Sequence, residues 1–417
     1  MVIWLINHYA VPPQYYPLSR QRFFAKYLLR MGHSVRIFAA SSVHNSSQNL
    51  INGKSAFIEL VDDGIDYVLI KASSYEGNGL SRIYNMMQFA WRLPGVLKKY
   101  RRPDVIVATS ITPIACMQGI RYAKKLGIRG IAEIADLWPE SLVAYKYLSA
   151  RNPLTKFMYQ YEKRLYTLAD AIIFTMEGGR DYIKDKGWDK EHGGPIELSK
   201  IYHINNGVDL EEFNDNKIMF SFSDPDLDDP NTFKVVYAGS IRKANNVRML
   251  LRVAEHLQRI RRNSIRLLVF GEGDERKNLE REAAASGLTN IVFKGALSKK
   301  ATAYAVTKAD LNYFHGRNTL ITRWGSSGNK LFDYLAAGKP ILSDLTVSYD
   351  VIQKYDCGFV VIKPNAQTIA NKMVEISELP ASVHTQYGYR ALQAAKDYDF
   401  SVLTRQLIDI MQKGGRQ

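Results

Sequence analysis

The strongest constraint in this sequence is an alternation of short apolar runs with longer segments of helical periodicity, which occurs in both halves of the chain. Several runs are apolar throughout, as expected for strands that helices cover on both faces of a parallel sheet. This pattern predicts two doubly wound α/β domains. The runs of the first half are Val2–Ile6, Ser34–Ala39, Asp66–Ile70, Asp104–Ala108, Gly130–Ala135, Ala171–Thr175 and Ile201–Asn205. The runs of the second half are Lys234–Ala238, Arg266–Phe270, Asn290–Lys294, Asp310–Phe314, Pro340–Ser343 and Gly358–Ile362.

The two halves meet near Asn214–Asn231, a segment that carries five aspartates and two prolines. Such a composition predicts a solvated linker or a surface insertion. We expect one domain over residues 1–206, a second over residues 207–395, and a final segment over residues 396–417. The helix of that segment, Phe400–Met411, is expected to cross back to the first domain. Ligands of such folds bind at the carboxyl ends of the strands, so a central cleft between two facing domains is the expected site.

The charge of the chain restricts its partners. The sequence contains 56 Lys and Arg against 41 Asp and Glu, a net charge of +15. Such an excess predicts an anionic partner, which could be a nucleotide, a nucleic acid or an acidic lipid surface. Most of the excess precedes residue 181, where 23 basic residues stand against 12 acidic ones.

Several classes of protein are excluded by composition. Two cysteines, Cys116 and Cys357, cannot form a disulfide scaffold or a multi-thiolate metal site, which favours a reducing cytosol. The first apolar run has no basic segment before it, so it predicts a buried strand rather than a signal peptide. No window reaches the roughly 18 apolar residues of a membrane span, so membrane contact would be peripheral. The eight histidines form no H-x-x-x-H pattern and no D-x-D follows a predicted strand, so no metal site is predicted.

The segment Gly325–Ile341, GSSGNKLFDYLAAGKPI, is typical of phosphate binding. Glycines and serines precede a predicted helix that begins near Asn329, and Lys330 lies in its first turn. Small residues let backbone N–H groups approach an anion, and the helix N-terminus adds partial positive charge. Asp333 lies one turn further, where its carboxylate could accept hydrogen bonds from a ribose diol. An ordinary helix–strand unit that ends in Gly338 would have the same pattern.

A second loop, Gly239–Lys243, lies between a strand and a helix of the same predicted domain. Its glycine, its hydroxyl and its two cations, Arg242 and Lys243, suit a diphosphate, although a solvated pair of charges has the same pattern. Gly271–Glu275 also follows a strand. Because it lacks a third glycine, it predicts a turn rather than a dinucleotide site.

Polar residues end several strands of the first half. Asn7 ends the first strand, Arg20 opens the first helix, His44 follows the second strand, and Glu133 and Asp136 end another strand. All belong to the carboxyl edge of the predicted sheet, where a ligand would bind. Two alternatives stay open, because Asp136 also suits a buried carboxylate that caps its turn, and His44 suits a surface loop.

The segment Leu80–Arg102 combines apolar residues at helical spacing with aromatic and basic residues, and it contains no acidic residue. A basic, aromatic, amphipathic helix can lie on an anionic bilayer. A crossover helix that packs on the core and exposes a solvated face fits the same pattern.

These motifs together carry a resemblance to a known family. The chain resembles glycosyltransferase family 4, the retaining enzymes of the GT-B fold, over essentially its whole length. The N-terminal motifs most resemble a branch of bacterial enzymes that build O-antigen and capsule repeat units. The motifs are NKLFDYLAAGKPI at Asn329–Ile341, AGSIRKANNVRMLLRVAE at Ala238–Glu255, HINNGVDLEEF at His203–Phe213, YEGNGLSRIYNMMQFAW at Tyr75–Trp91 and EIADLWPES at Glu133–Ser141.

The resemblance implies a donor site in the second domain. The family carries two glutamates eight positions apart, and here Asp333 takes the ribose-binding position while Gly325 takes the sugar-contacting one. The nucleotide-sugar contacts implied are Gly239, Arg242, Lys243, Ala296, Leu297, Ser326, Ser327, Gly328, Asn329, Lys330 and Asp333. In the first domain the implied acceptor contacts are Asn7, Arg20 and Glu133. The residues expected to take part in catalysis are His44, Asp136 and Lys330.

The resemblance also implies the reaction and its place. The expected activity is sugar transfer with retention from a nucleotide-sugar, most simply a UDP-sugar, to a saccharide on a polyprenyl diphosphate, without a metal cofactor. The expected location is cytoplasmic, on the anionic inner face of a bacterial plasma membrane, with no nucleic acid involved. The alternatives are a GDP-mannose-dependent mannosyltransferase, a non-hydrolysing UDP-sugar epimerase, a nucleic-acid-binding protein and a catalytically silent scaffold.

Overall fold

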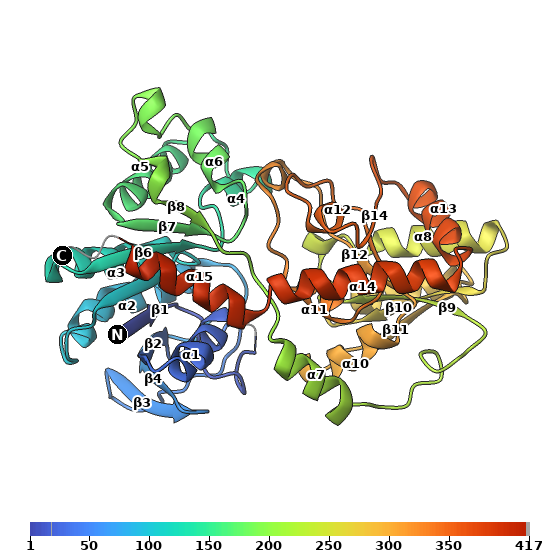
Figure 1. The fold of residues 1–417 in the computed structure, drawn as a ribbon, viewed down its shortest axis with the longest axis horizontal. Helices are drawn as coiled ribbons and strands as arrows, with labels where there is room; N and C mark the ends of the chain where they lie inside the picture. Colours follow the sequence, from blue (N-terminus) through green and yellow to red (C-terminus); the bar gives the residue numbers. More distant parts are fainter. Residues whose placement is uncertain (18, 414–417) are drawn as a thin grey trace. The chain divides into compact units, whose positions relative to one another are not determined.

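The computed structural model describes residues 1–17 and 19–413. The chain forms two compact units (Figure 1). Unit 1 contains Met1–Asn205 and the segment that begins at Phe400, and unit 2 contains Asn206–Asp399. Each unit holds one sheet of mainly parallel strands with helices on both faces, so the predicted α/β class with two Rossmann-like sheets is confirmed.

Unit 1 is built on an eight-stranded sheet with the order β3-β4-β2-β1-β5-β6-β7-β8. Its strands are β1 Val2–Ile6, β2 Ser34–Ala40, β3 Phe57–Asp62, β4 Ile65–Ile70, β5 Val105–Thr109, β6 Arg129–Ile134, β7 Ala171–Phe174 and β8 Ile201–His203. Its α-helices are α1 Arg20–Arg30, α2 Leu80–Leu97, α3 Pro113–Leu126, α4 Glu140–Ala144, α5 Pro153–Leu168, α6 Gly179–Asp185 and α15 Phe400–Gln412.

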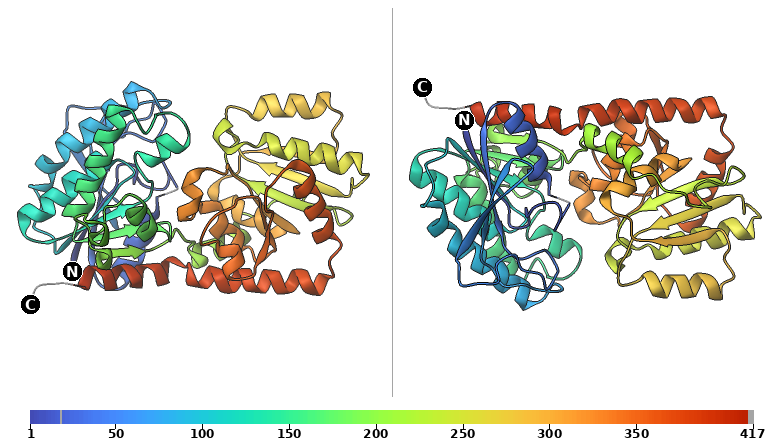
Figure 2. Two further views of the ribbon diagram at one scale, coloured as in Figure 1. Left: turned by 90° about the horizontal axis from the view of Figure 1, so that it is seen from above. Right: turned by 90° about the horizontal axis from the view of Figure 1, so that it is seen from below.

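Alternate residues of β1 show which helices cover which face of this sheet. Ile3 and Leu5 join the apolar cluster that contains residues of α1 and α15. Trp4, which points the other way, stacks on Tyr122 of α3 with ring centroids 6.3 Å apart. Helix α3 in turn contacts α2 and α5. Figure 2 shows α1 and α15 on one face of the sheet and α2 and α3 on the other.

Helix α15 is part of the core of unit 1, although it is the last helix of the chain. The ring of Phe400 stacks on Phe23 of α1, with centroids 4.5 Å apart and planes 14° apart. Leu403 and Leu407 of the same helix are buried in that cluster. The apolar face of α1 is therefore covered by residues that lie almost 400 positions later in the sequence.

The thirteen strands expected from the sequence are all present, and each begins within one residue of its expected start. Strand β3 was missed. It pairs antiparallel with β4 at the edge of the sheet, through a two-residue turn formed by Asp63 and Gly64. Both turn residues have positive φ, +48° and +72°, as a tight hairpin turn requires. The Asp-Gly pair was the sequence signal for this hairpin.

Unit 2 is built on a six-stranded parallel sheet with the order β11-β10-β9-β12-β13-β14. Its strands are β9 Phe233–Ala238, β10 Ile265–Phe270, β11 Ile291–Gly295, β12 Leu311–Phe314, β13 Ile341–Ser343 and β14 Gly358–Val360. Its α-helices are α7 Leu210–Met219, α8 Arg248–Arg259, α9 Arg276–Ala285, α10 Lys299–Lys308, α11 Asn329–Ala336, α12 Val351–Lys354, α13 Ala366–Ser377 and α14 Ala381–Asp397.

The strand order of unit 2 creates a switch point at its centre. From β9 the chain continues outward through β10 and β11, and it then returns to β12 on the other side of β9. The loops that follow β9 and β12 therefore leave the sheet in opposite directions. Parallel sheets bind their ligands in the crevice that this divergence leaves at the carboxyl ends of the strands.

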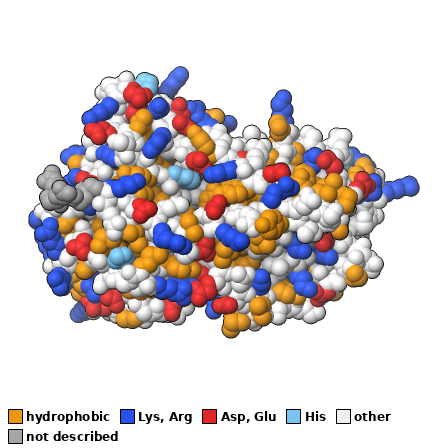
Figure 3. All heavy atoms as spheres, in the orientation of Figure 1, with side chains coloured by type: hydrophobic (Ala, Val, Ile, Leu, Met, Phe, Trp, Pro, Cys, Tyr) orange, Lys and Arg blue, Asp and Glu red, His pale blue; other side chains and the backbone are white. Residues whose placement is uncertain are grey.

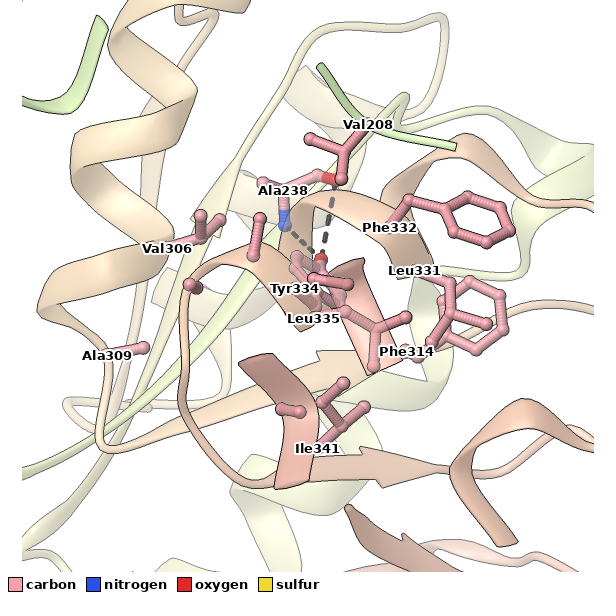
Figure 4. Packing of buried hydrophobic residues seen from close by; sticks show 14 of the residues in the cluster. Val208, Ala238, Val306, Ala309, Phe314, Leu331, Phe332, Tyr334, Leu335 and Ile341 are labelled. Carbon is pink, nitrogen blue, oxygen red and sulfur yellow. Dashed lines mark hydrogen bonds between the residues drawn. The ribbon is translucent and has the colours of Figure 1, made fainter. Parts of the chain in front are cut away.

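Helix α11 is fixed to the end of β9 by its own core residues (Figure 4). Leu331, Phe332 and Leu335 pack into the apolar cluster of unit 2. The hydroxyl of the buried Tyr334 accepts a hydrogen bond from the backbone N–H of Ala238 at 2.9 Å. This bond, from the second turn of α11, holds the helix close to the end of β9.

The acidic segment Asn214–Asn231 does not link the two units, so the solvated linker, one of the two expected alternatives, is wrong. Its first residues belong to α7, and the whole segment lies within unit 2. Asp224 pairs with Lys294 at 2.8 Å, and Asp226 pairs with Lys294 and Arg266. Its aspartates therefore attach the segment to β10 and β11 of the second sheet.

Candidate active site

The predicted donor residues gather at the switch point of unit 2. Gly239 directly follows β9, and Lys330 lies in the first turn of α11. A Cβ atom added at Gly239 would lie 2.7 Å from Cδ of Lys330. A side chain at position 239 would displace the Lys330 side chain, so the two segments predicted to bind phosphate lie against each other.

Lys330 is held by neutral groups. Its Nζ donates to the hydroxyl of Tyr237 at 3.2 Å and to the carbonyl of His315 at 3.3 Å, and it lies 4.5 Å from the centre of the Tyr237 ring. Burial lowers the pKa of Lys330 to about 8, and the charge of Asp344 opposes this shift. An anion beside Nζ would favour the charged ammonium.

The N-terminus of α11 is shaped for close approach. Gly328 occupies the N-cap position, so it has no side chain that could bond the N–H groups of the first turn. A Cβ atom at Gly328 would lie 3.1 Å from the ring of Phe314. Gly325 has a φ of +104°, and the backbone carbonyl of Ser327 accepts from Asn206 Nδ2 at 2.6 Å. The segment from Gly325 to Asn329, which includes Ser326, is therefore fixed in a form that suits an anion.

The cations Arg242 and Lys243 lie exposed on the loop after β9. Asn245 shapes this loop, because its Nδ2 donates to the carbonyl and the hydroxyl of Ser240 at 2.7 and 2.6 Å. The backbone of Gly271 packs directly against this loop, since a Cβ atom at Gly271 would lie 1.8 Å from the carbonyl oxygen of Gly239. The Gly271–Glu275 turn is thus part of the floor of the loop, a role that its sequence did not indicate.

A buried ionic pair, which the sequence did not indicate either, lies beneath Lys330. His315 Nδ1 is 2.6 Å from Asp344 Oδ2, and Tyr313 donates to the same oxygen at 2.9 Å. His315 Nε2 lies 2.9 Å from the carbonyl of Asn246. Each ring nitrogen therefore faces an oxygen of a different segment. The pair ties the loop after β9 to the ends of β12 and β13.

Asp333 is engaged by Lys299, the first residue of α10, in an ion pair. Ala296 and Leu297, which are expected to contact the base of the nucleotide, lie between β11 and this lysine. The structure therefore brings the expected ribose-binding carboxylate next to the segment expected to meet the base. Lys299 was not among the residues that the sequence indicated.

In unit 1, Asn7, Arg20 and Glu133 are joined in a buried network. Arg20 Nε lies 3.3 Å from Glu133 Oε1. Gln21 Nε2 donates to Glu133 Oε2 at 2.8 Å, and Gln21 Oε1 accepts from Asn7 Nδ2 at 2.7 Å. Thr109 also donates to Glu133 at 2.8 Å. These partners engage both oxygens of the carboxylate, so the network ties the strand ends of unit 1 together, and its contact with an acceptor stays a prediction.

His44 and Asp136 belong to a second, more open group. His44 Nδ1 is 2.6 Å from the hydroxyl of Tyr75, and its ring lies 4.5 Å from that of Tyr9. Arg82 of α2 donates to the Tyr9 hydroxyl at 3.2 Å. Asp136 is exposed in part, yet loss of hydration raises the pKa of its carboxyl, and the charge of Arg82 opposes this. Arg82 is thus a further cation between the two candidates, which the sequence assigned only to the amphipathic helix.

No set of three or more His, Cys, Asp and Glu side chains within residues 1–17 and 19–413 could hold a metal ion. A cavity of about 560 Å³ opens at the amino ends of β9 and β12, lined by Phe233, Asp310, His384 and Tyr389 among others. This is the opposite edge of the sheet from Lys330.

Family models match both units. Residues 222–393 match the model of glycosyl transferases group 1, and residues 22–212 match that of glycosyltransferase family 4. Between them the two models cover most of both units. The chain therefore belongs to the glycosyltransferases of the GT-B fold, with a family 4 domain followed by a group 1 domain, and it is an enzyme of sugar transfer. A comparison with curated protein sequences finds no match.

Solved structures share the fold along the whole chain. One is an E. coli trehalose-6-phosphate structure bound with UDP-2-fluoro glucose, with 12% identity, a TM-score of 0.73 and full coverage of both chains. Another is HepE from Anabaena in complex with UDP-glucose, with 13% identity, a TM-score of 0.64 and 98% coverage of each chain. A third is WaaG, a glycosyltransferase involved in lipopolysaccharide biosynthesis, with 15% identity, a TM-score of 0.67 and coverage of 99% and 100%.

Proposed function

We propose that this enzyme transfers a sugar from a UDP-sugar to a lipid-linked saccharide, with retention of the anomeric configuration. The observation that carries the proposal is Lys330, a cation held by neutral groups at the switch point of unit 2 and packed against Gly239. A diphosphate there would meet this ammonium, the N-terminus of α11 and the cations Arg242 and Lys243. The complexes of HepE and of the E. coli structure with UDP-sugars support uridine as the nucleotide.

The chemistry follows from where negative charge develops. When the bond between the sugar C1 and the diphosphate oxygen breaks, the leaving group gains charge that Lys330, Arg242 and Lys243 stabilise in place. These cations supply the charge that a divalent metal would otherwise bring, so we propose a metal-independent reaction. The acceptor hydroxyl attacks C1 on the face that the diphosphate leaves, and a phosphate oxygen takes its proton. Asp136 and His44 orient the acceptor.

The acceptor is proposed to be a saccharide on a polyprenyl diphosphate, in the assembly of a bacterial surface polysaccharide such as O-antigen or capsule. The role of WaaG in lipopolysaccharide biosynthesis supports this class of acceptor. We assign the acceptor to unit 1, where His44, Asp136 and Arg82 lie together. The enzyme would then work in the cytoplasm on the inner face of the plasma membrane.

The test is an incubation of the full chain with bacterial membranes and a panel of nucleotide-sugars, followed by mass spectrometry of the lipid extract. A lipid whose mass rises by one sugar with a UDP-linked donor is the expected result. A product with GDP-mannose alone would make the enzyme a mannosyltransferase, and conversion of a UDP-sugar without any acceptor would make it an epimerase. Thermal stabilisation by UDP but not by GDP is expected in parallel.

A further inference from the structure

Helix α2 exposes a row of large apolar side chains to solvent. Leu80, Tyr84, Met87 and Trp91 follow one another at spacings of four, three and four residues, which places them on one side of the helix. Leu80 is 83% exposed and Trp91 is 79% exposed. The opposite side of the helix is buried against the sheet and α3. The helix therefore has two apolar faces, whereas a surface helix of a globular protein normally has one.

The neighbouring helices also expose apolar side chains. Leu154 and Phe157, in the first two turns of α5, are 56% and 66% exposed, and Ile114 in the first turn of α3 is 37% exposed. Helices α3 and α5 are crossovers between parallel strands, so they start at the carboxyl edge of the sheet. Leu80, Ile114, Leu154 and Phe157 therefore lie near the edge of unit 1 that also carries His44 and Asp136. The row of α2 runs from there toward the other edge of the sheet.

The same three helices are strongly basic. Residues 80–102, 113–126 and 153–168 contain twelve Lys and Arg and one acidic residue, Glu162. Glu162 is buried and accepts hydrogen bonds from Tyr166 and Tyr182, so it adds no negative charge to the surface. By contrast, the face that α15 crosses mixes basic and acidic side chains (Figure 3). Helix α1 is also basic, but within Arg20–Arg30 it exposes no large apolar side chain.

We propose that the face formed by α2, α3 and α5 docks on an anionic lipid bilayer, with the apolar row of α2 inserted among the lipids. We name this face the docking face. Its apolar side chains match the acyl boundary, and its cations, which include Lys98, Lys99, Arg101 and Arg102 after the row, match anionic headgroups. No helix within the described residues is long and apolar enough to cross a membrane, so the contact is peripheral. The proposal rests on the proposed function only in that the bilayer would present the acceptor.

Vesicle flotation of the full chain, without donor or acceptor, tests the docking face. We expect recovery with phosphatidylglycerol-containing vesicles and little recovery with phosphatidylcholine alone. Met87→Ser with Trp91→Ser should lower the partition constant roughly tenfold, and Lys98→Gln with Lys99→Gln should do the same. The matched controls are Ile218→Ser with Met219→Ser at the exposed end of α7, and Lys277→Gln with Arg281→Gln on α9.

Trp91 gives a direct reading of insertion, because it is 79% exposed, whereas Trp4, Trp188 and Trp324 are buried and Trp138 is half-buried. Brominated anionic lipids should quench the tryptophan emission of the native chain, and Trp91→Phe should remove most of that quenching. Equal flotation with neutral and anionic vesicles, unchanged flotation of both docking-face variants, or the absence of quenching would overturn the proposal. The proposal would also be overturned if the native chain formed a dimer that did not float with vesicles and that dissociated in Trp91→Ser. The row would then be an interface between two copies of the chain.

Failure of the docking face and failure of the proposed function give different results. Flotation with no sugar transfer to any lipid would remove the proposed acceptor and leave the docking face standing. Sugar transfer to a detergent-solubilised lipid with no flotation would do the reverse.

Discussion

The two units place charged side chains at equivalent positions, the carboxyl ends of parallel strands, but they neutralise them differently. In unit 1, Arg20 faces the carboxylate of Glu133, and Gln21 and Thr109 complete the hydrogen bonds. In unit 2, Lys330 meets a hydroxyl and a carbonyl, and Asp344, the carboxylate whose charge acts on its pKa, is engaged by His315. One arrangement is internally neutral, and the other leaves a positive charge without a counter-ion among its contacts.

This difference separates residues that hold the fold from residues that hold a ligand. A buried ion pair that is fully hydrogen-bonded loses several kcal/mol when one partner is removed, because the other charge stays buried. A buried cation that contacts only neutral dipoles lowers the stability of the fold, because the charge has lost its hydration. Binding of an anion offsets this loss. The predicted roles of Arg20 and Lys330 are therefore distinguishable by experiment, although both are basic residues that open a helix after a strand.

The largest effect is expected for Glu133→Ala, which leaves Arg20 buried without its partner. We expect the free energy of unfolding of unit 1 to fall by about 3–5 kcal/mol. Urea denaturation monitored by circular dichroism measures this, and Glu191→Ala, at an exposed position, is the control. UDP affinity measured below the unfolding transition should stay unchanged, and a loss of UDP affinity at native stability would put Glu133 in a ligand site instead.

A somewhat smaller effect is expected for Lys330→Ala. Removing a cation that stabilises the departing diphosphate should lower kcat/KM by about a hundredfold or more, equivalent to about 3 kcal/mol. The thermal stability of the chain without ligand should not fall, since a desolvated charge is lost. Initial rates of sugar transfer measure kcat/KM and calorimetric titration measures UDP affinity, with Lys277→Ala as the control for both. Native UDP affinity in Lys330→Ala would move the donor site away from the switch point.

The pH dependence of donor binding should report the same side chain. Protonated Lys330 is the form that attracts a diphosphate, and its pKa in the unliganded chain is lowered to about 8 by burial. UDP affinity should thus be fully developed below that pH and fall as pH rises through it, by roughly tenfold between pH 7 and 9. Lys330→Arg keeps its charge over this range and should give a flat profile. A native profile that is flat as well would contradict the assignment.

The smallest effect is expected for Tyr334→Phe, which removes the hydrogen bond from the Ala238 N–H and leaves that buried donor unsatisfied. We expect a loss of about 1–2 kcal/mol in the stability of unit 2 and a modest fall in UDP affinity, because α11 is less firmly held against the loop after β9. Tyr389→Phe, on the exposed side of α14, is the matched substitution. Equal effects of the two changes would mean that the bond of Tyr334 contributes nothing.

The sequence was informative wherever a structure is determined by neighbours in the chain. The apolar runs located the strands, and the glycines and lysine of Gly325–Lys330 predicted the shape of a loop and the start of α11. Strand β3 escaped because its exposed residues alternate at the sheet edge, where no apolar run forms. The Asp63–Gly64 pair would have located its turn.

Contacts between distant residues were out of reach. His315 and Asp344 are 29 positions apart, and only the adjacency of β12 and β13 brings them together. Lys299 meets Asp333 across a similar separation, through the placement of α10 beside α11. Such pairs depend on the order of strands in the sheet, which periodicity does not encode. The same reason hid the convergence of α2, α3 and α5, of which only α2 was singled out in the sequence.

The place of α15 in unit 1 has a consequence for how the protein is made. The apolar face of α1, with Phe23 and Phe24, leaves the ribosome early, but the residue that covers it, Phe400, follows only after the whole of unit 2 has been synthesised. Domains usually fold in the order in which they emerge. Here unit 2 can complete its sheet first, while the apolar face of α1 in unit 1 is still uncovered. A nascent chain of this enzyme therefore spends most of its synthesis with an exposed patch that chaperones can bind.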